Sequence, residues 1–138
     1  MSVLFVDTNV VLDLLAKREP FYDSAAKLFS LADKKKVILS ISSLTFANTS
    51  YVLTRLKSAD KSREILRRFR VLVKVLLLDD KVIDLALNDN NFKDLDDGLQ
   101  YYSAIENGQE LIITRDLSGF KNSRIPVMTP EEYLISIE

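Results

Sequence analysis

Short apolar segments alternate with longer segments of helical periodicity along most of this chain. The apolar segments are rich in branched side chains, as buried strands are, and they span residues 3–6, 37–41, 73–78, 111–114 and 125–128. Strands that alternate with helices predict a parallel sheet, because each parallel crossover needs a connection that returns the chain to the same edge. We therefore expect a three-layer α/β/α sandwich with a central parallel sheet of about five strands.

The composition permits one hydrophobic core and excludes several kinds of active site. With 138 residues, 47% of them hydrophobic, the chain predicts a single domain over residues 1–138. Cysteine and histidine are absent, which excludes disulfides, thiolate nucleophiles, serine–histidine catalysis and nearly all zinc sites. Any catalysis must use carboxylates, hydroxyls, amides or basic side chains, and carboxylates suit hard cations such as Mg²⁺ or Mn²⁺.

The N-terminal apolar segment is a poor signal peptide, because no basic leader precedes it and Asp7 interrupts it. No stretch approaches the roughly 20 apolar residues that cross a bilayer. We therefore expect no association with a membrane and a cytoplasmic location.

A net charge of −1 conceals two oppositely charged segments. Residues 57–74 carry seven basic and two acidic side chains, whereas residues 79–97 carry seven acidic and two basic ones. The basic segment has helical periodicity and two interpretations: its cations form a solvated outer face, or they form a wall that contacts RNA phosphates. The candidate RNA-contacting side chains are Arg63, Arg67, Arg68 and Arg70.

Three aspartates are predicted to meet at one edge of the sheet. Asp7 follows the first strand, Asp116 follows the fourth, and Asp97 lies in the first turn of the helix that leads into the fourth. Ligands of open α/β sheets bind just beyond the carboxyl ends of the strands. Close carboxylates raise one another's pKa unless a cation neutralises them, so the cluster implies a metal ion or a retained proton. Metal-assisted hydrolysis of a phosphodiester suits such a site.

The order and spacing of several short motifs resemble the PIN domain. The motifs are Asp7-Thr8-Asn9, an apolar helix after the second strand, Asp94-Leu95-Asp96-Asp97-Gly98-Leu99-Gln100, Ile113-Thr114-Arg115-Asp116, Phe120 and Thr129-Pro130-Glu131-Glu132-Tyr133. The resemblance covers essentially the whole chain. It implies a ribonuclease that depends on Mg²⁺ or Mn²⁺, in a family that includes VapC-type toxins of prokaryotic toxin–antitoxin pairs. The implied partners are an RNA substrate and a small antitoxin protein, and we expect a homodimer.

The resemblance also implies a role for individual residues. The positions that match acids of the family's metal site are Asp7, Asp97 and Asp116. Thr114 matches the hydroxyl that supports these acids, and Asn9 matches the polar residue after the first acid.

The chain departs from the family pattern at two positions. Asn48, a further catalytic candidate, stands where the family normally has a glutamate, on a helix that is apolar around most of its circumference and is expected to be buried. An amide oxygen still coordinates a cation, but the change removes a negative charge, so we expect weaker metal binding and an altered or lost nuclease. Gly119 stands where many members have another acid, which leaves Asp94 and Asp96 as supporting acids.

Structural and functional alternatives are open at this point. Asp7 could cap a helix, Asp94 and Asp96 could be acids of a helix's first turn, and Asp116 could form a turn. A PIN-fold module that binds nucleic acid or protein without nuclease activity would explain Asn48. The Asp7 motif also loosely resembles the first motif of haloacid dehalogenase-type phosphohydrolases, but the second acid and the glycine-flanked Asp pair of that family are missing.

Overall fold

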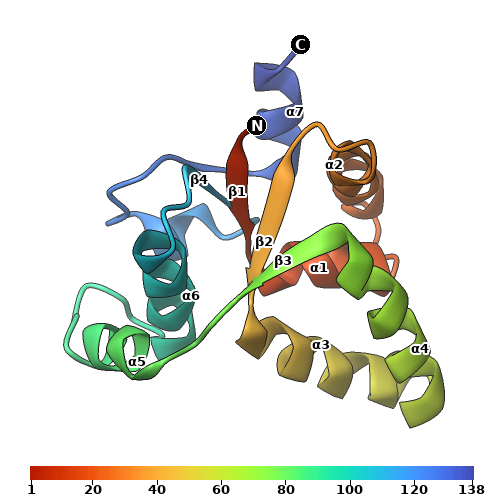
Figure 1. Cartoon of the computed structure of the whole chain (residues 1–138), viewed down its shortest axis with the longest axis horizontal. Coiled ribbons are helices and arrows are strands. Elements are labelled where there is room, and N and C mark those ends of the chain that lie inside the picture. The colour runs from red at the N-terminus through yellow and green to blue at the C-terminus, as the bar shows by residue number, and fades with distance from the viewer.

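The computed structural model describes residues 1–138 and contains one sheet of five parallel strands (Figure 1). The strands lie in the order β3-β2-β1-β4-β5, so β1 is the central strand and its neighbours are β2 and β4. The prediction of a parallel sheet of about five strands is therefore confirmed. The strands are β1 (Val3–Val6), β2 (Ile38–Ser42), β3 (Val73–Leu76), β4 (Leu111–Ile113) and β5 (Val127–Met128).

Seven α-helices and two 3₁₀ helices accompany the strands. Polar side chains begin several of them: the Ser42 hydroxyl accepts the N–H of Leu44, and Thr129 and Glu132 form a reciprocal capping box. None of the helices combines the length and the apolarity that crossing a membrane requires. The helices are α1 (Thr8–Leu15), α2 (Tyr22–Asp33), α3 (Ser43–Leu56), α4 (Ala59–Phe69), η1 (Arg70–Leu72), α5 (Asp80–Leu87), α6 (Leu95–Glu106), η2 (Leu117–Phe120) and α7 (Pro130–Ser136).

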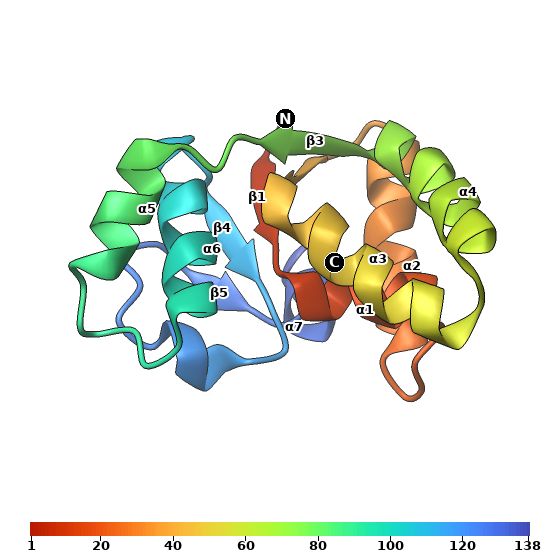
Figure 2. The ribbon, with the colours of Figure 1, turned by 90° about the horizontal axis from the view of Figure 1, so that it is seen from below.

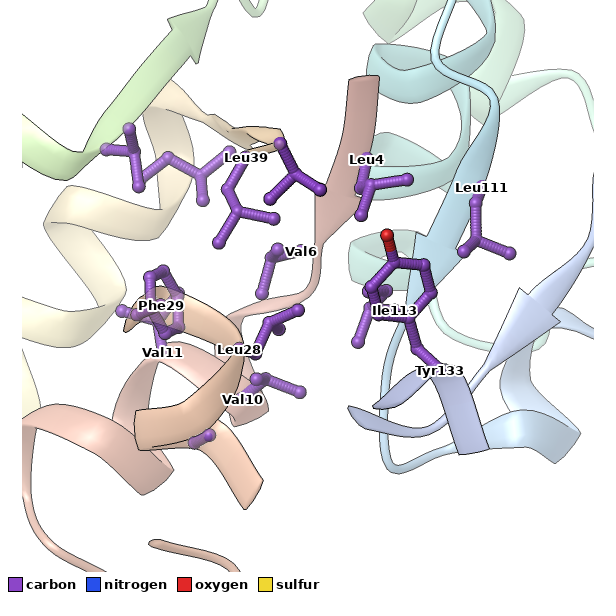
Figure 3. Packing of buried hydrophobic residues seen from close by; sticks show 14 of the residues in the cluster. Leu4, Val6, Val10, Val11, Leu28, Phe29, Leu39, Leu111, Ile113 and Tyr133 are labelled. Atoms are coloured by element: carbon purple, nitrogen blue, oxygen red, sulfur yellow. The ribbon is translucent and has the colours of Figure 1, made fainter. Parts of the chain in front are cut away.

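Helices cover both faces of the sheet, as a three-layer sandwich requires (Figures 1 and 2). Alternate side chains of β1 point to opposite faces, so Leu4 and Val6 belong to one buried cluster and Phe5 belongs to the other. Helices α1, α2 and α7 contribute to the first cluster, whereas α5 and α6 contribute to the second. Figure 3 shows the first cluster, where Phe29 and Tyr133 lie on either side of the strand that carries Leu4 and Val6.

Helix α3 corrects one expectation from the sequence. Its apolar circumference predicted a buried helix, but Tyr51 is 64% exposed and Leu56 is 63% exposed. The buried residues of α3 are Thr45, Thr49 and Leu53, which lie on one face at helical spacing. The helix packs mainly against α4 and α1 at the end of the sheet and does not lie flat across it (Figure 1). It therefore has one buried face and one exposed face.

Candidate active site at the carboxyl edge of the sheet

The strand order places Asp7 and Asp116 where the chain changes sides along the sheet. From β1 the chain passes to β2 and β3 on one side, whereas β4 and β5 lie on the other side. The Asp7 N–H donates to the Ile113 carbonyl at 2.9 Å, which ties the ends of β1 and β4 together. In open α/β sheets such a switch point is where ligands bind. Figure 2 shows the molecule from the side of this edge.

Asp7 is 5% exposed, and hydrogen bonds hold both of its carboxylate oxygens. The Thr8 N–H donates to Oδ1 at 2.8 Å, and the Thr114 hydroxyl donates to Oδ2 at 2.8 Å. Asn9 Nδ2 lies 3.4 Å from the same Oδ2 and 3.2 Å from Thr114 Oγ1. Asp7 thus caps α1 and also lies in the cluster at the edge, so the capping explanation does not exclude a functional one.

Thr114 and Asn9 both connect Asp7 to the loop that follows β4. The Thr114 hydroxyl, which donates to Asp7, also accepts the Asp116 N–H at 3.0 Å. Asn9 Oδ1 accepts the Arg115 N–H at 3.3 Å. A hydroxyl can donate and accept at once, so a single side chain links the two acids. These two predicted supporting residues lie between the first strand and the fourth-strand loop.

Asp97 and Asp116 face each other across Gly119. A Cβ added at Gly119 would lie 2.5 Å from Asp116 Oδ2 and 2.7 Å from Asp97 Oδ2, closer than real Cβ atoms approach other atoms. Asp116 Oδ1 is occupied, since it accepts the Ser118 hydroxyl at 2.9 Å and the Gly119 N–H at 3.1 Å. The missing side chain at position 119 therefore makes room for one oxygen of each acid beside the glycine, and we call the narrow space between these two oxygens, which is too small for a methyl group, the gap at Gly119.

Burial and neighbouring acids raise the pKa of two carboxyls at this edge. Burial raises the pKa of Asp7 to about 6, although its hydrogen bonds to Thr114 and Thr8 lower it. Burial, followed by the charges of Asp7 and Asp116, raises the pKa of Asp97 to about 7. Their charged forms are therefore less favoured than those of ordinary aspartates, and a cation bound beside them would favour those forms again.

Asp94 and Asp96 lie at the start of α6, shortly before Asp97 in the chain. Asp94 occupies the cap position, but its side chain makes no capping hydrogen bond. Burial and the charge of Asp94 raise the pKa of Asp96. Asp94 lines a hollow of about 400 Å³ together with Asp97 and Asp116, whereas Asp96 is not part of that lining. The structure thus places Asp94 on the lining of the hollow, whereas Asp96 lies outside that lining but close enough for its charge to raise the pKa of Asp7.

The chemistry of the donors at this edge fits a hard divalent cation. The available ligands are carboxylate, hydroxyl and amide oxygens, which Mg²⁺ and Mn²⁺ prefer, and two carboxylate oxygens already border one gap. The side chains do not, however, form a group of three or more acids close enough together to hold a metal ion. The candidate metal neighbours with facing oxygens are therefore Asp97 and Asp116, while the charge of Asp7 raises the pKa of Asp97.

Asn48 lies on α3 and is half-buried, next to a polar layer that the sequence did not reveal. Thr45, one turn earlier, has its Oγ1 2.9 Å from Oγ1 of Thr8. Gln100 Nε2 donates to the same Thr8 hydroxyl at 3.3 Å, and Gln100 Oε1 has no partner. These contacts join α3 to α1 and α6 beside the first acid. The signal for this layer in the sequence was a polar residue, Thr45, on the buried side of α3.

A second charged cluster beside the edge was also missed. Asp13 is 1% exposed and pairs with Arg18 and Arg115. Its signal was an acid within the apolar segment over residues 10–15, where a charge is buried only when it is paired.

The basic residues of α4, and Arg70 at the start of η1, lie apart from the acids. In both views α4 lies beyond α3, on the opposite side from α6 (Figures 1 and 2). Arg68 donates to Glu64 at 2.9 Å, and Arg70 donates to the Val73 carbonyl at 3.0 Å. All four candidate side chains are exposed, which fits a solvated outer face. These side chains are Arg63, Arg67, Arg68 and Arg70.

The chain is similar in sequence to known proteins. A family model described as the PIN domain matches residues 3–118. Ribonuclease VapC1 of Aquifex aeolicus (strain VF5) is 31% identical over 133 residues, which cover 94% of this chain and 92% of that protein.

Solved structures share the fold. A chain of DNA-bound VapBC from Salmonella typhimurium has a TM-score of 0.72 at 18% identity, over 94% of this chain and 99% of that chain. The sarcin-ricin loop cleaving toxin VapC20 of Mycobacterium tuberculosis has a TM-score of 0.62 at 15% identity, over 79% of this chain and 86% of that one.

Proposed function

Because this chain belongs to the PIN-domain family, we propose that it is a divalent-metal-dependent endoribonuclease and the toxin of a toxin–antitoxin pair. The observation that carries the proposal is the pair of carboxylate oxygens, from Asp97 and Asp116, that border the gap at Gly119. The name of the relative VapC1, a ribonuclease, supports RNA as the substrate.

Mg²⁺ or Mn²⁺ would be held by Asp97 and Asp116, with Asp7 and Asn48 as further candidate ligands. Such an ion, when bound, supplies a Lewis acid that activates water and neutralises charge on a phosphodiester. Asp7 adds negative charge from a buried position, and the Thr114 hydroxyl orients its carboxylate. An amide at position 48 offers an oxygen but no charge, so we expect weaker metal binding than a glutamate would give.

Two lysines at the mouth of the site suit the phosphates of a substrate. Lys93 and Lys121 line the same hollow as Asp97 and Asp116. Both are exposed, so their ammonium groups can reach an incoming anion. They would draw the backbone of RNA toward the acids, with an affinity that falls as salt is added.

The basic face of α4 is proposed as a more distant contact for a long RNA. Arg63 and Arg67 are exposed and form no ion pair, so they are available to phosphates. Because α4 lies beyond α3, these residues would affect RNA affinity and leave metal binding unchanged.

A small antitoxin protein and a second copy of the chain are the proposed protein partners. The Salmonella typhimurium structure with this fold is a VapBC assembly, which supports an antitoxin. Exposed apolar side chains are available for such contacts, and they include Tyr51, Leu56, Leu77 and Leu87.

A PIN-fold binding module without nuclease activity is the second candidate. Asn48 and the lack of a group of three acids favour it. Isothermal titration with Mn²⁺ separates the two proposals, because the module predicts no detectable binding even at millimolar metal.

The direct test is cleavage of structured and unstructured RNA by the purified protein. We expect cleavage with Mg²⁺ or Mn²⁺ and none with a chelator. Cleavage that survives chelation would contradict the metal-dependent proposal, and intact RNA under all conditions, with no Mn²⁺ bound, would favour the module.

A further inference from the structure

Asp13 is a buried carboxylate that two arginines clamp. Arg115 donates to it through two nitrogens, Nε to Oδ2 at 2.6 Å and Nη2 to Oδ1 at 3.1 Å. Arg18 Nε donates to Oδ1 at 2.9 Å, and Arg18 Nη2 donates to the Asn9 carbonyl at 3.0 Å. The carboxylate is 1% exposed, whereas the arginine side chains are 29% and 39% exposed. The charge of Asp13 is therefore fully compensated inside the chain.

Arg115 is held at both its side chain and its backbone. Its guanidinium lies 3.8 Å from the centre of the Phe21 ring, in addition to the bidentate contact with Asp13. Its N–H donates to Asn9 Oδ1 at 3.3 Å. Such a planar, bidentate contact restricts direction as well as distance, which a lysine could not do. The residue immediately before Asp116 is thus fixed to α1 and to the segment that leads from α1 to α2.

The position of this clamp in the chain indicates its use. Arg115 lies between Thr114, which donates to Asp7, and Asp116, which borders the gap at Gly119. Buried ion pairs add little net stability, because desolvation of the charges offsets their attraction. The contacts of Arg115 do fix the loop after β4. The positions of Asp7 and Asp116 relative to each other depend on where that loop lies.

We propose that Arg115, held by the Asp13 carboxylate that Arg18 also pairs with, is a positioning residue that sets the Asp116 carboxylate relative to Asp7. It does not contact substrate or metal, and it acts through the loop over residues 114–119. The inference rests on the proposed function only where metal affinity is measured, because the position of the loop can be followed without metal.

The test compares Arg115→Gln, Arg115→Lys, Asp13→Asn and the double variant Asp13→Asn/Arg115→Gln with wild type. Arg124→Gln is the matched control, because Arg124 is exposed and lies outside this clamp. The first readout is hydrogen exchange and the NMR shift of the Asp116 and Gly119 amides, which donate to Thr114 Oγ1 and Asp116 Oδ1. The second readout is Mn²⁺ affinity by calorimetry, with circular dichroism to confirm folding.

We expect the two amides to exchange roughly tenfold faster in Arg115→Gln, and Mn²⁺ affinity to fall about 10- to 100-fold, as when groups that orient metal ligands are removed. Arg115→Lys should fall between wild type and Arg115→Gln. The double variant should be no worse than either single one, because both remove the same contact. The control should match wild type.

Folded variants whose Asp116 and Gly119 amides keep wild-type shifts and exchange rates would overturn the proposal. If Arg115→Gln fails to fold, Arg115→Lys and Arg18→Gln test the proposal by the same comparison. Each of them weakens the contacts to Asp13 but leaves one arginine paired with it. A wild-type protein that binds no Mn²⁺ would instead overturn the proposed function, and the amide readout would still decide the role of Arg115.

Discussion

The two halves of the acidic edge are built differently. The buried half consists of Asp7, Asn9 and Thr114, and both oxygens of its carboxylate accept hydrogen bonds. The open half consists of Asp97, Asp116 and Gly119, and in it one oxygen of each acid faces the same gap. Hydrogen bonds hold both carboxylate oxygens of the first half, whereas in the second half they hold only Asp116 Oδ1 and the two facing oxygens accept none.

The difference indicates which half depends on a cation. A carboxylate held by donors keeps its geometry with or without metal. Two facing carboxylate oxygens that accept no hydrogen bond repel each other, so they keep their positions only when a cation or a proton lies between them. We therefore expect the buried half to determine where a metal binds and the open half to become ordered when it does.

Replacing Asp7 with Asn tests the buried half and should have the largest effect. The side chain keeps its size but loses its charge, so we expect RNA cleavage to fall at least about 1,000-fold and Mn²⁺ binding to be lost. Stability should not fall, because burial disfavours the charge that is removed. Cleavage assays, calorimetry and thermal unfolding measure the three quantities. Retained cleavage would contradict the role assigned to Asp7.

The pH dependence of stability compares the two halves without RNA. Because both pKa values are raised, the folded chain retains protons at pH values where the unfolded chain has lost them. This range runs from pH 3.8 to about 6 for Asp7 and from pH 3.8 to about 7 for Asp97. The stabilisation is complete below pH 3.8 and is lost as pH rises through these values. The Asp7 shift corresponds to at most about 3 kcal/mol. Denaturant unfolding at pH 5 and pH 7.5 measures the part of this loss that falls between those two pH values.

Adding metal and replacing Asp7 should each change how stability depends on pH. Saturating Mn²⁺ should raise stability at pH 7.5 more than at pH 5, because bound metal displaces the proton. Asp7→Asn should remove the part of the dependence that Asp7 contributes. A metal-free protein that is equally stable at both pH values would contradict the raised pKa values.

Gly119→Ala tests the open half directly. The added Cβ would overlap the positions of both acid oxygens, so Mn²⁺ affinity should fall about 10- to 100-fold. Gly98→Ala is the matched control, because the Cβ added to this residue of α6 would meet its nearest neighbour, Ala86 Cβ of α5, at an ordinary 3.5 Å. The control should leave metal affinity unchanged and raise stability by about 0.5–1 kcal/mol. Equal Mn²⁺ affinities for the two variants would show that the gap does not matter.

Asn48→Glu restores the acid that the family pattern has and should have the smallest effect. Adding a carboxylate should strengthen Mn²⁺ binding about tenfold, since affinity follows the charge of the ligands. Thr54→Glu adds the same charge to an exposed position of α3 and serves as the control. Calorimetry compares the two variants. If both raise affinity equally, the effect is general electrostatics and Asn48 has no special place in the site.

Much of this arrangement was predictable from local patterns. The alternation of strands and helices predicted the parallel sheet, and the spacing of the short motifs predicted the PIN-domain family; both predictions are confirmed. Asp7 and Asp116 follow adjacent strands, so their shared edge also followed from a parallel sheet. The roles of these residues in metal binding and catalysis stay predictions.

Other features could not be predicted, because they depend on packing. The expected burial of α3 was wrong, since apolar periodicity does not reveal how far a helix extends past the sheet. Gly119 was interpreted as a missing acid, whereas the structure shows that its missing Cβ makes room for Asp97 and Asp116. Gln100 carried too weak a signal to be assigned to the polar layer beside the first acid.

By itself, the sequence determined the fold class, the family and the exclusion of histidine and cysteine chemistry, because periodicity, motif spacing and composition are properties that the chain carries without folding. Only the tertiary structure decided which side chains hold the acids in place. Those contacts join residues far apart in the chain, 107 positions for Asp7 and Thr114 and 102 for Asp13 and Arg115. Hydrogen bonds and ion pairs weaken when the distance between their atoms changes by a few tenths of an ångström, and packing, unlike sequence spacing, sets distances that finely.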